Sequence, residues 1–388
     1  MAPSIEYLSM LPVDVLRTVI HELDYESASN LVEICESNAR YDLVRSECCR
    51  RMSVVTYLGD TFVNPRELLR SMARADAYMW GGKAAAFFIR NSATNNSSWN
   101  ISVPVHGPNL VALMKTLEQC GVVWNTVLDE VRELFSKGHG FITVDAAKYR
   151  TYSVSIIGIA INEFHYEFII ELPINASSTA EIHLEGKQVK VKSTGFNNDS
   201  FFRHSVWTCC GYIDHGHSRT KVRIGGESHY EMNALVQYHS SCMQAIISPH
   251  VAIHLYGKLA CSLRSYAWKR NTAIGSGGDC LEYEKLERSG FVYEKPTVTQ
   301  EWESVDSGAA IVARYPDSTG FKSDVANADV EYYCSMTWRT LTSHIQFDHP
   351  HVMLYHRLRN TLTILNNSVQ EQDAEYLRKY APRACSLF

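Results

Sequence analysis

The sequence lacks any hydrophobic run long enough to cross a membrane. Its longest apolar stretch, residues 154–160, is interrupted by Ser155 and has the length of a strand, whereas a membrane-spanning helix needs about 20 apolar residues. Residues 1–10 also lack a charged segment followed by an apolar core, so we expect no signal peptide. We therefore expect a protein of the cytoplasm or the nucleus.

A surplus of basic charge is also missing. The chain has a net charge of -5 and a pI near 6.3. Nucleic-acid-binding domains usually carry a basic surplus, so no nucleic-acid partner is expected. The 388 residues, of which 45% are hydrophobic and 20% charged, are typical of a globular protein with about two or three domains.

The cysteines do not form an even framework of the kind that disulfide-rich proteins show. The chain has 11 cysteines at scattered positions, and without a signal peptide we expect them to be reduced. The segment CCGYIDHGH brings together Cys209, Cys210, His215 and His217, all of which can bind zinc. Adjacent strand residues point to opposite faces, so core thiols and loop histidines are favoured over a metal site.

Between residues 8 and 50, apolar residues recur at helical spacing and predict three short helices. The first begins after Pro12, the second near Ser27 and the third near Tyr41. The Leu-Pro pair that ends at Pro12, the aliphatic positions after it and the acidic turn around Asp24 resemble an F-box. One departure is Asp14, which stands where many members have Glu. The alternative is a three-helix cap that binds no partner.

The F-box resemblance implies docking onto the Skp1-type adaptor of a ubiquitin ligase through an apolar helix face. The residues that would either contact the adaptor or pack inside the module are Leu11, Pro12, Val15, Leu16, Val19 and Ile20. The sequence pattern does not assign each of these side chains to one of the two roles.

Alternating helices and strands are predicted for the rest of the chain. After a linker at residues 51–63, helices are expected at 65–74, 83–90, 108–120, 124–135, 230–247, 251–268 and 281–289. Strands are expected at 77–80, 99–105, 154–161, 167–172, 181–191, 204–212 and 220–224, and exposed loops at 271–279 and 317–328.

Residues 81–103, GGKAAAFFIRNSATNNSSWNISV, place a glycine turn between a strand and a helix. With the later segments TKVRIGG and YEKLERSGF, they resemble a family of fungal proteins with a nucleotidyltransferase-like core, over about residues 75–293. The resemblance implies that Gly81, Gly82 and Lys83 bind a phosphate or nucleotide, because glycine lets backbone N–H groups approach phosphate oxygens. The alternative is that the glycines only permit a tight turn and Lys83 is solvated.

The resemblance also implies two metal-binding carboxylates at the start of the next strand and a third on a later strand. Ser98 and Asn100 occupy the first two positions, and the later strand offers Lys221 and Arg223. Without a carboxylate, Mg²⁺ stays mostly hydrated, and phosphoryl transfer loses its main electrostatic stabilisation. We therefore expect a pseudoenzyme with no metal and no cofactor.

The expected fold class is α+β. We expect an F-box-like helical module at residues 1–55 and a catalytically degenerate nucleotidyltransferase-like domain of mixed helices and strands at 56–295. A C-terminal extension with helical additions, at 296–388, is expected to pack on that core.

The expected function is recognition, in which the degenerate domain holds a client protein and the F-box-like module delivers it for ubiquitination. One alternative is an interaction protein in fungal genome conflict, defence or host manipulation, and another is a divergent metal-dependent nucleotidyltransferase. Residues 385–388 also fit a prenylation motif on Cys385. Membrane contact is expected only with that modification, and an unmodified terminus is the alternative.

Overall fold

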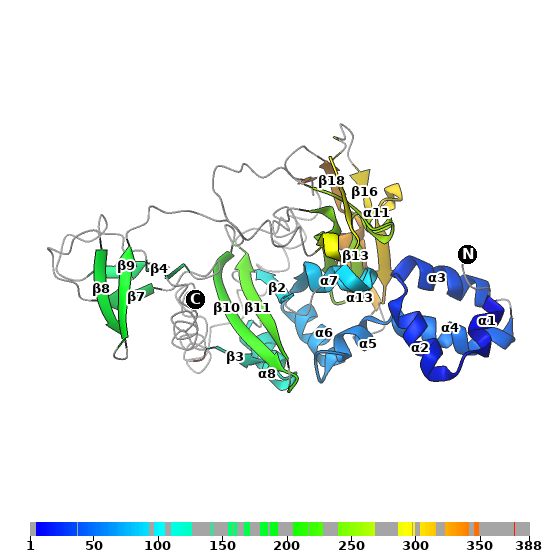
Figure 1. Cartoon of the computed structure of the whole chain (residues 1–388), viewed down its shortest axis with the longest axis horizontal. Coiled ribbons are helices and arrows are strands. Elements are labelled where there is room, and N and C mark those ends of the chain that lie inside the picture. Colours follow the sequence, from blue (N-terminus) through cyan, green and yellow to red (C-terminus); the bar gives the residue numbers. More distant parts are fainter. Residues whose placement is uncertain are drawn as a thin grey trace.

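A computed structural model describes residues 5–36, 38–92, 97–104, 110–125, 205–216, 218–227, 240–267, 286–296, 298, 303–315, 323–340, 345–348 and 376, and short strands between residues 141 and 192. The protein is a mixed α+β structure in which helices lead into a mixed sheet (Figure 1). In the part that is described, no helix combines the length and the apolar character that crossing a bilayer requires.

Four α-helices at the N-terminus, which we call the N-terminal module, gather at one end of the molecule (Figure 1). They are α1 (Ile5–Met10), α2 (Val13–Glu22), α3 (Tyr25–Cys35) and α4 (Asp42–Arg51), with the 3₁₀ turn η1 (Ala39–Tyr41) before α4. The module has a core of its own, the N-terminal core, built from Leu8, Leu16, Ile20, Cys35, Tyr41, Val44 and Cys48.

Local chemistry explains where these helices begin. Pro12, whose ring fixes φ, precedes α2, and the Asp24 carboxylate caps α3 by accepting the Ser27 N–H at 2.8 Å. Glu47 of α4 is buried and accepts from Arg17 of α2 and from Arg50. Burial alone would raise the pKa of Glu47, but the bonds from Arg50 and Arg17 outweigh it, so the pKa is lowered.

The predicted linker at residues 51–63 is wrong, because this segment contains the helix α5 (Val54–Gly59). Ser53 caps it by accepting the Thr56 N–H. Val54, Tyr57 and Leu58 share one helix face and are buried in the main core. The predicted boundary between residues 55 and 56 therefore falls inside α5.

The main sheet has eight strands in the order β17-β13-β12-β1-β2-β11-β10-β3. Their bounds are β1 (Tyr78–Trp80), β2 (Trp99–Pro104), β3 (Val123–Trp124), β10 (Ser205–Asp214), β11 (Arg219–Glu227), β12 (Ala245–Ile247), β13 (Val251–His254) and β17 (Ile311–Arg314). β2 and β11 run parallel, and the other neighbouring strands are antiparallel.

The two faces of this sheet carry different layers. One, the helical face, packs with α5, α6 (Pro65–Arg74), α7 (Gly82–Phe88) and α8 (Leu110–Gln119) around alternate β2 residues such as Trp99 and Ile101. The other, the opposite face, presents Trp80 and Ile253 to the side chains of Tyr333, from α13 (Ser323–Cys334), and of Trp338, from β18 (Thr337–Thr340). Successive residues of one strand therefore point to opposite faces and pack against different layers.

Shorter elements complete the described structure. They are α11 (Gly257–Cys261), the 3₁₀ turns η2 (Arg90–Ser92), η3 (Ser241–Met243) and η4 (Val305–Ser307), and strands β4 (Phe141–Ile142), β5 (Val154–Ile157), β6 (Ile159–Ala160), β7 (Glu167–Ile170), β8 (Thr179–Leu184), β9 (Lys187–Lys192), β14 (Arg264–Tyr266), β15 (Val292–Glu294), β16 (Glu303–Ser304) and β19 (Ile345–Asp348).

Several sequence-based predictions of elements are wrong. The helix expected at residues 251–268 is β13, α11 and β14, and the one at 230–247 ends in η3 and β12. These short apolar runs form central strands, and a continuous apolar run has no period that separates a buried strand from a buried helix. Residues 181–191 are not one strand but parts of the antiparallel pair β8 and β9.

Three more corrections concern the ends of the predicted elements. Trp124 lies in β3 rather than at a helix start, and the rest of the predicted helix at 124–135 lies almost entirely outside the described residues. α13 begins inside the loop expected at 317–328. In the expected C-terminal extension, β17 joins the main sheet and α13 is accompanied by strands, so the additions are not helical alone.

Candidate functional site

The glycine turn that leads from β1 into α7 depends on Gly81. Gly81 has φ 90° and ψ -156°, which is essentially a glycine-only conformation. Its N–H donates to the Ala245 carbonyl at 3.2 Å, and its own carbonyl accepts from the Ala85 N–H at 2.8 Å. The turn is therefore bonded to β12 on one side and to α7 on the other.

Gly82 has no such backbone requirement. A Cβ added there would lie 3.5 Å from the Met243 side chain and 3.5 Å from the Ser97 hydroxyl, which is ordinary contact. Both glycines are buried. Of the three residues predicted to bind phosphate, Lys83 lines the cavity of about 360 Å³ described below, and Gly81 and Gly82 do not.

Ser98 and Asn100, the predicted degenerate metal positions, lie on β2 or directly before it. Asn100 is in register with Arg223 of β11 in the parallel pair, and with Trp80 of β1 on its other side. The side chain of Asn100 is buried, and its Oδ1 accepts no hydrogen bond from the described residues. The structure thus brings Asn100 next to the later strand, where the register neighbour is a cation rather than a carboxylate.

Lys83 and Asn100 belong to different faces of the sheet. Trp99, which precedes Asn100, packs in the helical face against Tyr57 and Phe62, with ring centroids 5.8 and 5.4 Å away. Because strand residues alternate, Asn100 points to the opposite face. The structure therefore does not bring the predicted phosphate-binding lysine and the predicted metal positions into one site.

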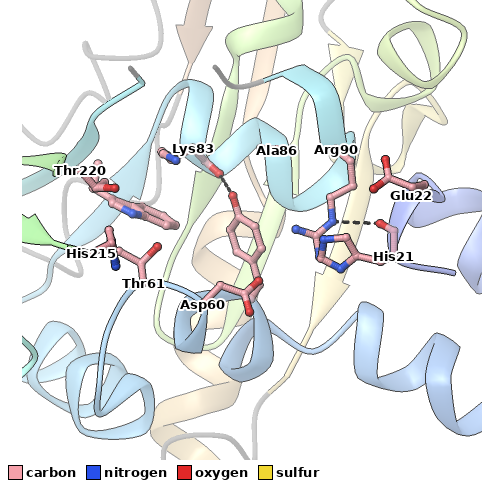
Figure 2. A pocket seen from close by; sticks show the side chains of 11 residues that line it. His21, Glu22, Asp60, Thr61, Lys83, Ala86, Arg90, His215 and Thr220 are labelled. Atoms are coloured by element: carbon pink, nitrogen blue, oxygen red, sulfur yellow. Dashed lines mark hydrogen bonds between the residues drawn. The ribbon is translucent and has the colours of Figure 1, made fainter. Parts of the chain in front are cut away.

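A cavity of about 360 Å³ opens between the N-terminal module and the helical face (Figure 2). We call it the junction cavity. It is lined by His21 and Glu22 of α2, Tyr57, Asp60 and Thr61 at α5, Lys83 and Ala86 of α7, Arg90 of η2, Trp99 of β2, and His215 and Thr220 at the β10–β11 turn.

Arg90 connects the cavity to the N-terminal module. Its Nε donates to the His21 carbonyl at 3.1 Å, its Nη2 lies 3.1 Å from His21 Nδ1 and its guanidinium lies 5.3 Å from the Tyr57 ring centroid. Burial lowers the pKa of His21, and the charge of Arg90 lowers it further. Burial also raises the pKa of Tyr57, whose hydroxyl donates to the Lys83 carbonyl.

A second, buried arginine also forms a hydrogen bond between the N-terminal module and α7. Arg51, at the end of α4, donates from Nε to the Leu23 carbonyl at 3.1 Å and from Nη1 to the Phe87 carbonyl at 2.9 Å. Burial, followed by the charge of Arg90, lowers the pKa of Arg51 to about 10. Carbonyls at the C-terminal ends of α2 and α7 therefore receive cationic donors, as the helix dipole favours.

The residues predicted to contact the adaptor divide between two environments. Leu16 (0% exposed) and Ile20 (1%) are in the N-terminal core, whereas Val15 (46%) and Val19 (36%) lie one turn apart on the exposed face of α2. Leu11 is half-buried against the core, and Pro12 is exposed.

The cysteine segment does not form a ligand cluster. Cys209 and Cys210 are buried on opposite faces of β10, and His215 is exposed at the following turn. Among the described residues, no three side chains of the types that bind metals lie together. His217 and Cys385 lie outside the described residues.

The comparisons with known proteins add no family and no fold relative. No family model, no curated protein and no solved structure matches the chain.

Proposed function

We propose that this protein is a non-catalytic recognition protein whose F-box-like N-terminal module docks onto a Skp1-type adaptor. In this role the sheet-bearing part of the chain, a pseudo-nucleotidyltransferase, would hold a client for ubiquitination. The observation that carries the proposal is the division within α2, in which Leu16 and Ile20 pack inward while Val15 and Val19 stay exposed.

An adaptor-binding helix needs this division. Its inward residues must fold the module, and its outward residues must be free to lose their contact with water on binding. Exposed apolar side chains continue beyond α2, since Tyr7 (69% exposed) and Met10 (68%) of α1 are also on the surface. Tyr and Met are enriched in protein interfaces.

The junction supports an adaptor role because delivery of a client needs a defined geometry between the two ends of the molecule. Two carbonyl bonds cross between the N-terminal module and the rest of the chain: Arg51 of α4 donates to the Phe87 carbonyl, and Arg90 donates to the His21 carbonyl. Tyr25 of α3 adds ring contacts with Phe87 and Phe88 of α7, each with centroids 5.5 Å apart. The N-terminal module is thus packed onto the rest of the chain rather than joined to it by a flexible linker alone.

The pseudoenzyme part of the proposal rests on Asn100 and Arg223. Phosphoryl-transfer metals are held by carboxylates, and here a neutral amide and a guanidinium are register neighbours. A guanidinium at this place would repel a divalent cation. We expect no Mg²⁺- or Mn²⁺-dependent transfer from any common nucleoside triphosphate, and transfer that a chelator abolishes would contradict the pseudoenzyme assignment.

Co-purification from cells tests the adaptor assignment. The intact chain, tagged and expressed with a tagged Skp1-type adaptor, should capture it, and mass spectrometry of the same sample should identify client proteins. A matched variant pair carries the control: Val19→Asp should reduce capture, whereas Val63→Asp, at an exposed valine outside the N-terminal module, should not. If the wild-type chain captures no adaptor, the module is only a helical cap.

A further inference from the structure

Two hydrogen-bond donors that lack acceptors line the junction cavity. Lys83 is half-buried, and its ammonium group forms no ion pair or hydrogen bond within the described part of the chain. Trp99 is 1% exposed, and its Nε1 is a buried donor with no acceptor among those same residues. A buried donor that stays unsatisfied costs about 1–3 kcal/mol, so both groups favour a ligand that brings acceptors.

The two carboxylates that line the cavity, Glu22 and Asp60, interact with Arg90 and His21 rather than with Lys83. Figure 2 shows Glu22 beside Arg90 and His21, at the end of the cavity away from Lys83. Asp60 and Glu22 both interact electrostatically with Arg90 and with His21. Burial is the only cause that shifts the pKa of Lys83, and it lowers it. The positive charge of Lys83 therefore has no counter-charge in the described structure.

The Lys83 end of the cavity carries further groups that can donate. Thr61, Thr220 and His215 gather there (Figure 2). A tetrahedral phosphate has enough oxygens to accept from an ammonium, an indole N–H and two hydroxyls together, whereas a carboxylate has two oxygens. The cavity volume of about 360 Å³ is at the lower end of the range of about 300–1,000 Å³ for small-molecule sites.

We propose that the junction cavity binds a small phosphate-bearing ligand, with the phosphoryl group between Lys83 and Trp99 Nε1. The site differs from the glycine turn, since neither Gly81 nor Gly82 lines it, and it does not depend on the adaptor role. Because His21 and Glu22 of the N-terminal module line the other end of the cavity, a ligand that extends from the phosphoryl group to that end would contact both sides of the junction and stabilise their packing.

Titration of the full chain with inorganic phosphate tests this site. Calorimetry and thermal unfolding are measured at constant ionic strength, with sodium chloride and sodium acetate as reference salts. Phosphate should raise the melting temperature of the wild type more than acetate does, because its greater negative charge and its tetrahedral oxygens suit donors that converge from several sides.

Two substitutions examine the two unmatched donors. Lys83→Met should weaken phosphate binding by about tenfold or more, since hydrogen bonds to charged groups contribute about 1.5–3 kcal/mol. Trp99→Phe should also weaken it by about tenfold or more, because the indole N–H would donate to a charged acceptor. The matched control is Lys258→Met, at an exposed lysine of α11 that does not line the cavity, and it should bind as the wild type does.

The proposal is overturned if the wild type gives no response to phosphate beyond that to acetate, or if Lys83→Met binds phosphate as tightly as Lys258→Met. Melting temperatures without ligand verify that each variant is folded. A parallel titration with ATP distinguishes two sources of the phosphoryl group: tighter binding than inorganic phosphate indicates a nucleotide, and weaker binding indicates a smaller phosphate ester.

Discussion

The N-terminal module and the rest of the chain, here called the body, differ in how many large apolar side chains they leave exposed. The body encloses its sheet between two layers, and the large apolar side chains that it leaves exposed in the described structure are scattered over several elements: Val63, Val123, Leu263, Val292 and Val298. The much shorter module exposes Tyr7, Met10, Val13, Val15, Val19, Ile34 and Leu43. This concentration of exposed apolar side chains fits the docking role proposed for the module, whereas the body contributes most of the lining of the junction cavity.

Substitutions on the two sides of α2 are expected to have the largest and most unequal effects. Leu16→Ala removes a fully buried side chain from the N-terminal core and should lower the free energy of unfolding by about 2–5 kcal/mol. Val19→Ala, on the exposed face, should change it by no more than about 0.5 kcal/mol. Urea unfolding followed by circular dichroism measures both. Equal losses would show that α2 has no outward face.

Acid should weaken the body through His254. This side chain is fully buried, its Nε2 lies 3.2 Å from the Cys242 carbonyl oxygen, and burial lowers its pKa from 6.5 to about 4. Between these two values the unfolded chain binds a proton that the folded chain does not. The stabilisation is complete above pH 6.5 and falls by about 3 kcal/mol as the pH decreases to 4.

The measurement is the free energy of unfolding of wild type and His254→Gln across that pH range. The glutamine variant should show a shallower pH dependence, while His215→Gln, at an exposed histidine, should keep the wild-type slope. Identical slopes for wild type and His254→Gln would mean that this histidine titrates normally in the folded protein.

Alanine substitutions at the two glycines of the turn should have different effects on the free energy of unfolding, and these effects should be smaller than those above. Gly81→Ala places a Cβ on a backbone with φ 90° and should lower the free energy of unfolding by about 1–3 kcal/mol. Gly82→Ala meets only ordinary contacts and should be neutral or stabilising by up to about 1 kcal/mol. Thermal unfolding of both variants decides the point, and a stable Gly81→Ala protein would contradict the described turn.

Gly81 and Gly82 also show how much of the structure can be predicted from the sequence. The glycine turn was predicted correctly, but the choice between Gly81 and Gly82 depends on one backbone angle that composition does not reveal. Amphipathic helices such as α6 and α8 were predicted because their apolar residues repeat at helical spacing. The segment at 251–268 was misassigned because its short apolar runs lack a period.

The two candidate sites also differ in whether the sequence predicts them. Asn100 and Arg223 were predicted to occupy related positions through a resemblance, and the strand register does place them side by side. The junction cavity was not predicted, because its residues come from segments distant in the sequence, among them His21, Tyr57, Lys83, Trp99 and His215. No local spacing rule connects such residues. The contact of α2 with Arg90 of η2 and the packing of Tyr57 of α5 against α7 bring them together.

Direct binding of a purified Skp1-type adaptor tests the central claim most sharply. Calorimetry compares the wild type, a Val15→Asp/Val19→Asp double variant and the Val63→Asp control, each with its melting temperature. The account predicts that wild type and Val63→Asp bind with similar affinity. The double variant should lose binding while it keeps a wild-type melting temperature, because its two changes lie on an exposed face. A wild-type protein that does not bind the adaptor, or a double variant that binds it as tightly as the wild type, would contradict the account.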